Sequence, residues 1–135
     1  MRWLLTLPFP VFVLLAYNAL VLPSGDPTAT LTASVISMSL ASGAAFTLTV
    51  GELLLLMGVL ALFIEIVKAT RGSMASAVDH ALSALVFVAY LIEFLLVRAA
   101  GTGVFLVLTL TSFLDLIAGF TVTIGAARRD LTIDR

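Results

Sequence analysis

Four apolar stretches, each long enough to cross a lipid bilayer as a helix, constrain this sequence more than any other feature. They cover about residues 3–22, 51–67, 77–97 and 104–126, and a helix needs about 20 apolar residues to span the hydrocarbon core. Only 11% of the 135 residues are charged and 61% are hydrophobic, too much apolar surface for a small soluble fold to bury. The sequence therefore predicts an all-α membrane protein, a four-transmembrane-helix bundle forming one domain over residues 1–135.

The basic residues predict how such a bundle is oriented. With four spans, only Arg98 falls on one side, and the other side holds Arg2, Lys68, Arg71, Arg128, Arg129 and Arg135. Short cytoplasmic loops carry the excess of Lys and Arg, so both termini are predicted to be cytoplasmic. The first stretch could also serve as a secretory signal, but residues 20–23 (LVLP) make a poor cleavage site. We expect it to remain as the first helix.

The segment between the first two apolar stretches has a different periodicity. Apolar residues alternate with serine or threonine on both sides of a short glycine-containing loop, at Ile36, Met38, Leu40, Phe46, Leu48 and Val50. This pattern predicts a β-hairpin over about residues 35–50, with Leu40 facing Phe46 and Met38 facing Leu48. The alternative is an N-terminal extension of the second helix, for which β-branched alternation is unusual. The hairpin would lie at the extracytoplasmic membrane surface, because lipid does not tolerate unpaired strand edges.

Ionisable residues inside the apolar stretches are candidate functional groups, because each costs about 2.5–3.5 kcal/mol at the centre of a membrane helix. Asp115 falls near the middle of the fourth stretch, Glu93 in the outer half of the third, and Glu52 and Glu65 at the two ends of the second. Ser112 shares a helix face with Asp115, and we expect that face to point into the bundle. Asp115 would then hold helices together through a hydrogen bond or in its protonated form, handle a proton or cation, or contact a partner subunit.

A second polar face runs along the third stretch. Its members recur at helical spacing and are Asp79, Ser83, Tyr90 and Glu93. Glu93 lies at a depth that Tyr17 and Asn18 of the first stretch could reach. A contact of Glu93 with Tyr17 or with Arg98 would give it a purely structural role.

Other polar residues have structural interpretations as well. Glu65 lies one turn before Lys68, which predicts an interfacial salt bridge. Gly51 and Gly58 precede Glu65 at intervals of seven, and small residues at that spacing allow helices to approach closely. His80 is the only histidine, and a metal site needs several converging ligands, so we interpret His80 as an interfacial polar residue.

Composition and motifs exclude several kinds of function. The chain has no cysteine, which excludes disulfides and thiolate metal sites. Its net charge of -1 argues against a nucleic-acid-binding surface, which needs a basic patch. The sequence contains no nucleophile elbow, phosphate-binding loop, HExxH pair or dinucleotide fingerprint. We therefore expect neither an enzyme nor a bound cofactor.

Several runs in the last two-thirds of the chain resemble a known group of proteins. They are TVGEL at residues 49–53, EIVKATR at 65–71, VDH at 78–80 and TVTIGAARR at 121–129. Through these runs the chain resembles small four-span inner-membrane proteins of bacteria. The resemblance implies a bacterial inner membrane and a bundle with a hairpin, but it brings neither an activity nor functional residues.

Two functions fit this sequence. The first is an accessory or structural subunit that packs against a larger membrane complex, because the chain has many small and apolar residues and no catalytic motif. The second is a homo-oligomeric proton or ion channel or transporter, in which Asp115, Glu93, Glu52 and Glu65 form a ladder of carboxylates across the membrane. The expected partners are the lipid bilayer and either another membrane protein or further copies of this chain.

Overall fold

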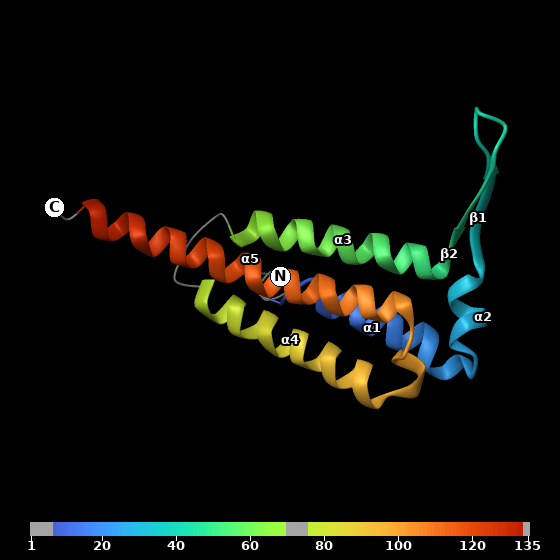
Figure 1. Cartoon of the computed structure of the whole chain (residues 1–135), viewed down its shortest axis with the longest axis horizontal. Coiled ribbons are helices and arrows are strands. Elements are labelled where there is room, and N and C mark those ends of the chain that lie inside the picture. Colours follow the sequence, from blue (N-terminus) through green and yellow to red (C-terminus); the bar gives the residue numbers. More distant parts are fainter. Residues whose placement is uncertain (1–6, 70–75, 134–135) are drawn as a thin grey trace.

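The computed structural model describes the backbone of residues 7–69 and 76–133, and the side chains of residues 7–69 and 80–121. Four longer helices lie side by side, and a short helix and a two-stranded hairpin lie at one end of them (Figure 1). In chain order the elements are α1 (Pro10–Val21), the 3₁₀ turn η2 (Leu22–Ser24), α2 (Pro27–Thr32), β1 (Ser34–Ser39), β2 (Ala45–Thr49), α3 (Val50–Ala69), α4 (Ser76–Leu96), the 3₁₀ turn η3 (Arg98–Ala100) and α5 (Gly103–Ile133). The predicted helical class and hairpin are both confirmed.

The helix α5 is central to the bundle. It packs along both α3 and α4, and α1 also packs against α3 and α4, so α5 lies between α3 and α4 in Figure 1. Its first turns carry Phe105 and Leu108, which are buried together with Tyr17 of α1 and Tyr90 of α4. The backbone of α5 stays helical to Ile133, beyond the end that the apolar stretch predicted at residue 126.

Two of the described helices are long and apolar enough to cross a membrane. They are α3, over Val50–Ala69, and the first part of α5, over Gly103–Thr121. The segments Pro10–Ser24 and His80–Leu96 are apolar but shorter. Two helices of membrane length are thus observed, and a bundle of four spans remains a prediction.

The first helix begins later than the apolar stretch predicted. Pro10 is its first residue, a position that suits proline because its φ is already helical and its missing N–H has no partner to lose. The preceding Phe9 is the N-cap residue. Its backbone N–H donates to Oε1 of Glu65 in α3, at 2.7 Å. Residues 3–6 of the predicted span lie outside the described part of the chain.

Residues 23–27 (PSGDP) have a composition typical of a turn, but Pro27 begins a short helix, α2, that the sequence does not predict. Asp26 is its N-cap, and the Asp26 carboxylate accepts a hydrogen bond from the backbone N–H of Ala29 at 3.0 Å. Pro27 follows at the first helical position, so Asp-Pro supplies both a cap and a preset φ. Leu31 is its buried residue, and α2 packs against α3.

The two strands confirm the alternating pattern but not the predicted register. Met38 pairs with Phe46, and Ser37 pairs with Thr47, whereas the sequence pattern predicts Met38 opposite Leu48. The correction is a shift of two residues, so the same side chains still share a face. Met38 and Phe46 therefore remain on the apolar face, and Ser37 and Thr47 on the polar one.

The turn explains this shift. The Leu40 N–H donates to the Ala44 carbonyl at 2.9 Å, and the Gly43 N–H donates to the Leu40 carbonyl at 2.8 Å. Gly43 has a φ of 81°, the left-handed conformation that completes a three-residue hairpin loop. The predicted pairing of Leu40 with Phe46 implies a loop over residues 41–45, which is two residues longer than the observed one.

The side chains of the bundle are distributed with polar groups inside and apolar groups outside. The buried polar residues are Glu65, His80, Ser83, Thr109, Ser112 and Asp115. The exposed helix faces carry large apolar side chains, among them Leu15, Leu60, Phe63, Leu85, Leu95, Leu96 and Leu114. Leu96 is 78% exposed and Asp115 only 6%, the reverse of the arrangement usual in a protein surrounded by water.

Candidate functional site

Asp115 lies where α3, α4 and α5 meet. Its carboxylate accepts a hydrogen bond from the hydroxyl of Ser83 on α4, and it lies within electrostatic range of Glu65 and Lys68 on α3. We refer to Glu65, Lys68, Ser83, Ser112 and Asp115 as the Asp115 cluster. The prediction that Asp115 faces the bundle interior is confirmed by its burial.

Glu65 connects this cluster to the start of α1. Its carboxylate forms a salt bridge with Lys68, with Nζ 3.0 Å from Oε2, and it also accepts the Phe9 N–H. The predicted Glu65–Lys68 pair is therefore present. The Glu65 side chain is only 6% exposed, so its carboxylate is buried within the chain. A carboxylate with two partners of this kind satisfies much of its hydrogen-bonding capacity.

Ser112 and Asp115 contribute two buried oxygens that stay without a partner in the described part of the chain. Neither Ser112 Oγ nor Asp115 Oδ2 has a hydrogen-bond partner among the described residues. The two residues are three apart in α5 and therefore face the same side of the helix. Buried polar atoms normally have partners, which sets these two oxygens apart from the hydrogen-bonded carboxylate of Glu65.

His80 packs one turn away from Ser83, against α5. A Cβ added at Gly119 would overlap the imidazole ring, and the His80 ring lies 5.9 Å from the Phe120 ring, centroid to centroid. His80 is buried within the chain, and its location at the membrane interface stays a prediction. Among the described residues, no group of three or more His, Cys, Asp or Glu side chains is placed to hold a metal ion.

Glu93 belongs to a second polar cluster, nearer the hairpin end of the bundle. Its carboxylate accepts a hydrogen bond from Nδ2 of Asn18 at 3.0 Å. Asn18 is one of the residues predicted to reach Glu93, and it is the observed partner in place of the predicted Tyr17 or Arg98. Glu93 Oε1 and Asn18 Oδ1 have no further partner among the described residues. We refer to Tyr17, Asn18, Tyr90, Glu93 and Thr102 as the Glu93 cluster.

Two buried tyrosines fix the backbone around this cluster. The Tyr17 hydroxyl donates to the Ala99 carbonyl at 3.0 Å and lies 2.9 Å from Thr102 Oγ1. The Tyr90 hydroxyl donates to the Pro10 carbonyl at 2.9 Å. Tyr90 thus holds the start of α1 and Tyr17 holds the turn between α4 and α5, so both act on backbone rather than on a ligand.

Glu52 lies apart from both clusters. It is exposed, and its carboxylate accepts hydrogen bonds from the N–H and the hydroxyl of Thr49 at 2.8 and 3.0 Å. Thr49 Oγ1 in turn accepts the Glu52 N–H at 3.3 Å. This reciprocal pair is a capping box at the start of α3, a signal that the sequence Thr-x-x-Glu already contained.

An apolar layer separates the two clusters. Phe105 and Leu108 of α5 are buried between them, and the Phe105 ring lies 5.4 Å from the ring of Tyr90 in the Glu93 cluster. From Thr102 to Asp115 the helix α5 rises about 20 Å, at about 1.5 Å per residue. The structure therefore brings Asp115, Ser112 and Glu65 together and places Tyr90 and Glu93 in a separate group. Glu52 belongs to neither group.

No family model matches this chain, and neither a curated protein nor a solved structure matches it. The interpretation of both clusters rests on their geometry.

Proposed function

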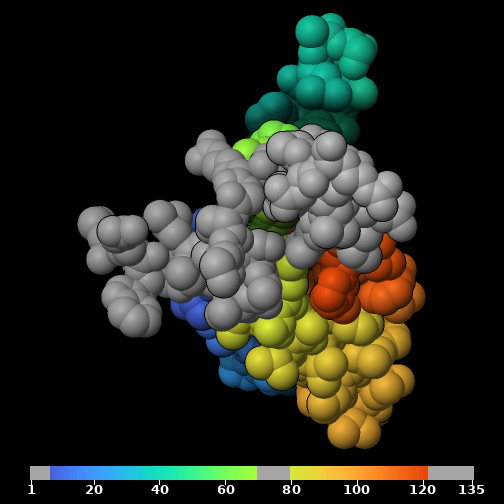
Figure 2. All heavy atoms as spheres, turned by 90° about the vertical axis from the view of Figure 1, so that its left-hand side faces the viewer, coloured from blue at the N-terminus to red at the C-terminus, as the bar shows by residue number. Residues whose placement is uncertain are grey.

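We propose that this chain is a small multi-pass membrane protein that serves as an accessory subunit of a larger membrane complex. It would bind its partner through the apolar face of the hairpin, defined by Ile36, Met38, Leu40 and Phe46. The observation that carries this proposal is the position of the hairpin, which stands clear of the helices in two views at right angles (Figures 1 and 2).

The membrane placement is supported by the inverted distribution of side chains. Large apolar residues cover the outer faces of the helices, while carboxylates and hydroxyls are buried between them. A lipid bilayer favours this arrangement, because contact with lipid costs apolar side chains no free energy and the polar groups form hydrogen bonds inside the bundle. We place both termini in the cytoplasm and the hairpin outside, in a bacterial inner membrane.

The hairpin has the properties of a surface that needs a partner. Every residue of β1 is exposed, and the side chains of Met38 and Phe46 pair across the strands without cover from a helix. An isolated two-stranded hairpin is at best marginally stable in water. Residues 34–49 also contain no charge, whereas free strand edges are usually protected by charged residues.

Site-specific photocrosslinking in native membranes tests this proposal. A photoreactive residue at Met38 or Phe46 should give one discrete adduct, and the same residue at Ser37 or Thr47 on the opposite face should give little. The double variant Met38→Ser/Phe46→Ser should abolish co-purification of the crosslinked protein in mild detergent. Equal crosslinking from both faces, or a chain that runs alone after extraction, would exclude the accessory role.

A second candidate is a homo-oligomeric proton or cation channel or transporter. It is favoured by the unpartnered oxygens of Ser112 and Asp115. Conduction through a single protomer would have to pass Phe105 and Leu108, which are fully buried. Proton or sodium flux into liposomes that Asp115→Asn leaves unchanged would rule this function out.

A further inference from the structure

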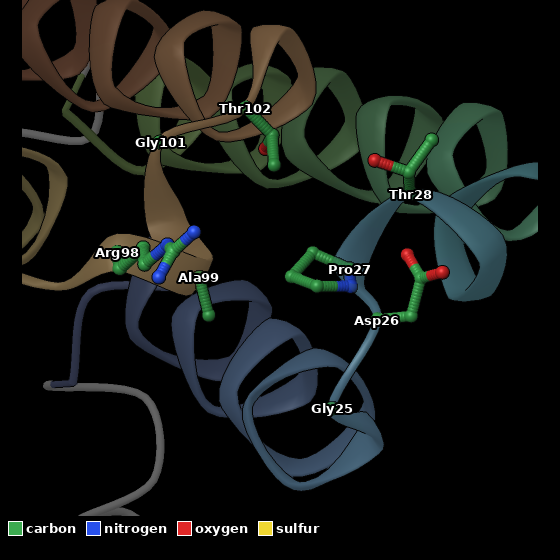
Figure 3. A pocket seen from close by; sticks show the side chains of 8 residues that line it. All are labelled: Gly25, Asp26, Pro27, Thr28, Arg98, Ala99, Gly101 and Thr102. Atoms are coloured by element: carbon green, nitrogen blue, oxygen red, sulfur yellow. The ribbon is translucent and has the colours of Figure 1, made fainter.

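A pocket opens where the turn after α1 meets the turn between α4 and α5 (Figure 3). Its volume is about 540 Å³, and it is lined by Gly25, Asp26, Pro27, Thr28, Arg98, Ala99, Gly101 and Thr102. The lining comes from two segments more than 60 residues apart in sequence. The pocket lies at the hairpin end of the bundle, away from the Asp115 cluster, and it shares Thr102 with the Glu93 cluster.

The pocket carries one positive and one negative side chain on different walls. Arg98 lies on the wall formed by η3, and Asp26 lies on the opposite wall before α2, with Pro27 between them (Figure 3). Within the described residues, the Arg98 guanidinium has no hydrogen bond or ion pair, and only one carboxylate oxygen of Asp26 has a partner, the Ala29 N–H. The two side chains thus present opposite charges to the same space without neutralising each other.

The wall that carries Arg98 is held in place from the core. The fully buried Tyr17 donates to the Ala99 carbonyl and contacts Thr102 Oγ1. Thr102 also caps α5, because its Oγ1 accepts the Phe105 N–H at 3.1 Å. Arg98 therefore projects from a backbone that is already fixed, which lowers the entropic cost of binding a ligand.

Apolar side chains adjoin the pocket along the chain on both walls. Leu95 and Leu96, two to three residues before Arg98, are 67% and 78% exposed, and Leu22 lies three residues before Gly25 and is 39% exposed. A ligand with a charged head and an apolar tail fits a charged pocket that has apolar side chains beside it. Hydrophobic helix ends of this kind face lipid acyl chains when the helices span a bilayer.

We propose that this pocket binds the headgroup of a zwitterionic phospholipid with a primary ammonium group, such as a phosphoethanolamine headgroup. Arg98 binds the phosphate, for which the guanidinium offers a planar set of donors. Asp26 binds the ammonium, supported by the hydroxyl of Thr28. The inference rests on the membrane placement proposed above and names a specific lipid that the chain binds there.

The Asp26 carboxylate determines which headgroup fits. It would repel a second negative charge, so an anionic headgroup with no ammonium gains from Arg98 and loses at Asp26. A quaternary ammonium cannot donate hydrogen bonds to Asp26 or Thr28, whereas a primary ammonium donates three. The pocket should therefore prefer phosphatidylethanolamine over both phosphatidylcholine and phosphatidylglycerol.

Native mass spectrometry of the purified full chain tests this preference, with the three lipids at equal concentration and with identical acyl chains. The unmodified chain should retain phosphatidylethanolamine most strongly, and Arg98→Gln should weaken its retention about tenfold, which corresponds to about 1.4 kcal/mol. Asp26→Asn should reduce the preference over phosphatidylcholine while keeping the fold, because Asn caps a helix as well as Asp does. Glu52→Gln, which removes another exposed carboxylate at the same end and keeps its capping box, should change nothing.

Soluble phosphoethanolamine and inorganic phosphate serve as competitors that separate a lipid from a free anion. If either displaces the lipid at equal concentration, the pocket is a site for a soluble phosphate compound and the lipid assignment is wrong. Equal retention of all three lipids, or variants that behave like the unmodified chain, would also overturn it.

Extraction of membranes with alkaline carbonate keeps this test distinct from that of the proposed function. A chain that washes out of the membrane contradicts the membrane placement itself. A chain that stays in the membrane but shows no dependence on Arg98 contradicts only the lipid site.

Discussion

The Glu65 carboxylate accepts the backbone N–H of Phe9 at 2.7 Å, although the two residues are 56 positions apart. This bond connects the start of α1 to the last turns of α3, where Glu65 also pairs with Lys68. The first backbone N–H groups of a helix have no acceptor within the helix. A side chain near the end of α3 thus accepts the hydrogen bond from one such N–H at the start of α1. It makes Glu65 a structural connection between helices as well as a member of the Asp115 cluster.

Replacing Glu65 by alanine should destabilise the protein by about 1–3 kcal/mol, because the partly buried Phe9 N–H loses its acceptor. Glu65→Gln should cost less, since its amide oxygen can still accept from Phe9. The free energy of unfolding in detergent micelles, measured by denaturant titration, distinguishes the two variants. Equal losses would mean that the charge of Glu65, rather than the hydrogen bond to Phe9, carries the effect.

The contact between His80 and Gly119 should not tolerate a larger side chain at position 119. Gly119→Ala places a methyl group where the imidazole now lies, and overpacking of this kind costs about 1–3 kcal/mol. The matched control is Gly103→Ala, because nothing lies within 4 Å of a Cβ at Gly103. Thermal unfolding should show a clear loss for the first variant and little change for the second.

The double variant Gly119→Ala/His80→Ala tests the cause of this loss. Removing the imidazole should restore part of the stability, with a coupling energy of at least about 0.5 kcal/mol between the two positions. Strict additivity would show that Gly119 is required for another reason, such as the approach of the α4 backbone.

The sequence predicted the elements whose signals are local and strong. Apolar length alone located α3 to within two residues at each end, and the serine and threonine alternation located the hairpin. The burial of Asp115 and Ser112 could also be predicted, because an intramembrane polar face has to point into the bundle.

The remaining features depend on contacts that periodicity does not encode. The Asn18–Glu93 bond requires knowing how α1 is rotated against α4, which sequence spacing does not fix. The bond from Phe9 to Glu65 involves a backbone N–H, which is present at every residue and gives no sequence signal. In contrast, the Asp26 cap of α2 and the Thr49–Glu52 capping box were legible in the sequence, because each has a recognised spacing.

The conformation of Gly43 makes the hairpin turn sensitive to substitution. Gly43 has a φ of 81°, and a Cβ in the left-handed region costs about 1–2 kcal/mol. Gly43→Ala should therefore loosen the hairpin, and Gly43→Asn should do so less, because asparagine tolerates this conformation. Hydrogen exchange of the Leu40 and Gly43 amides measures the effect, and unchanged protection in both variants would contradict the three-residue turn.

The two serines of the Asp115 cluster should respond to alanine to different extents. Ser83 donates to Asp115, so Ser83→Ala removes a hydrogen bond to a buried carboxylate and should cost about 1–3 kcal/mol. Ser112 Oγ has no partner among the described residues, so Ser112→Ala loses no protein hydrogen bond and should change the free energy of unfolding by less than about 0.5 kcal/mol. Denaturant titration of both variants in the same detergent gives the comparison. A loss at Ser112 as large as that at Ser83 would mean that its hydroxyl binds a water or a cation beside Asp115, and it would favour proton or cation handling over a purely structural role for this cluster.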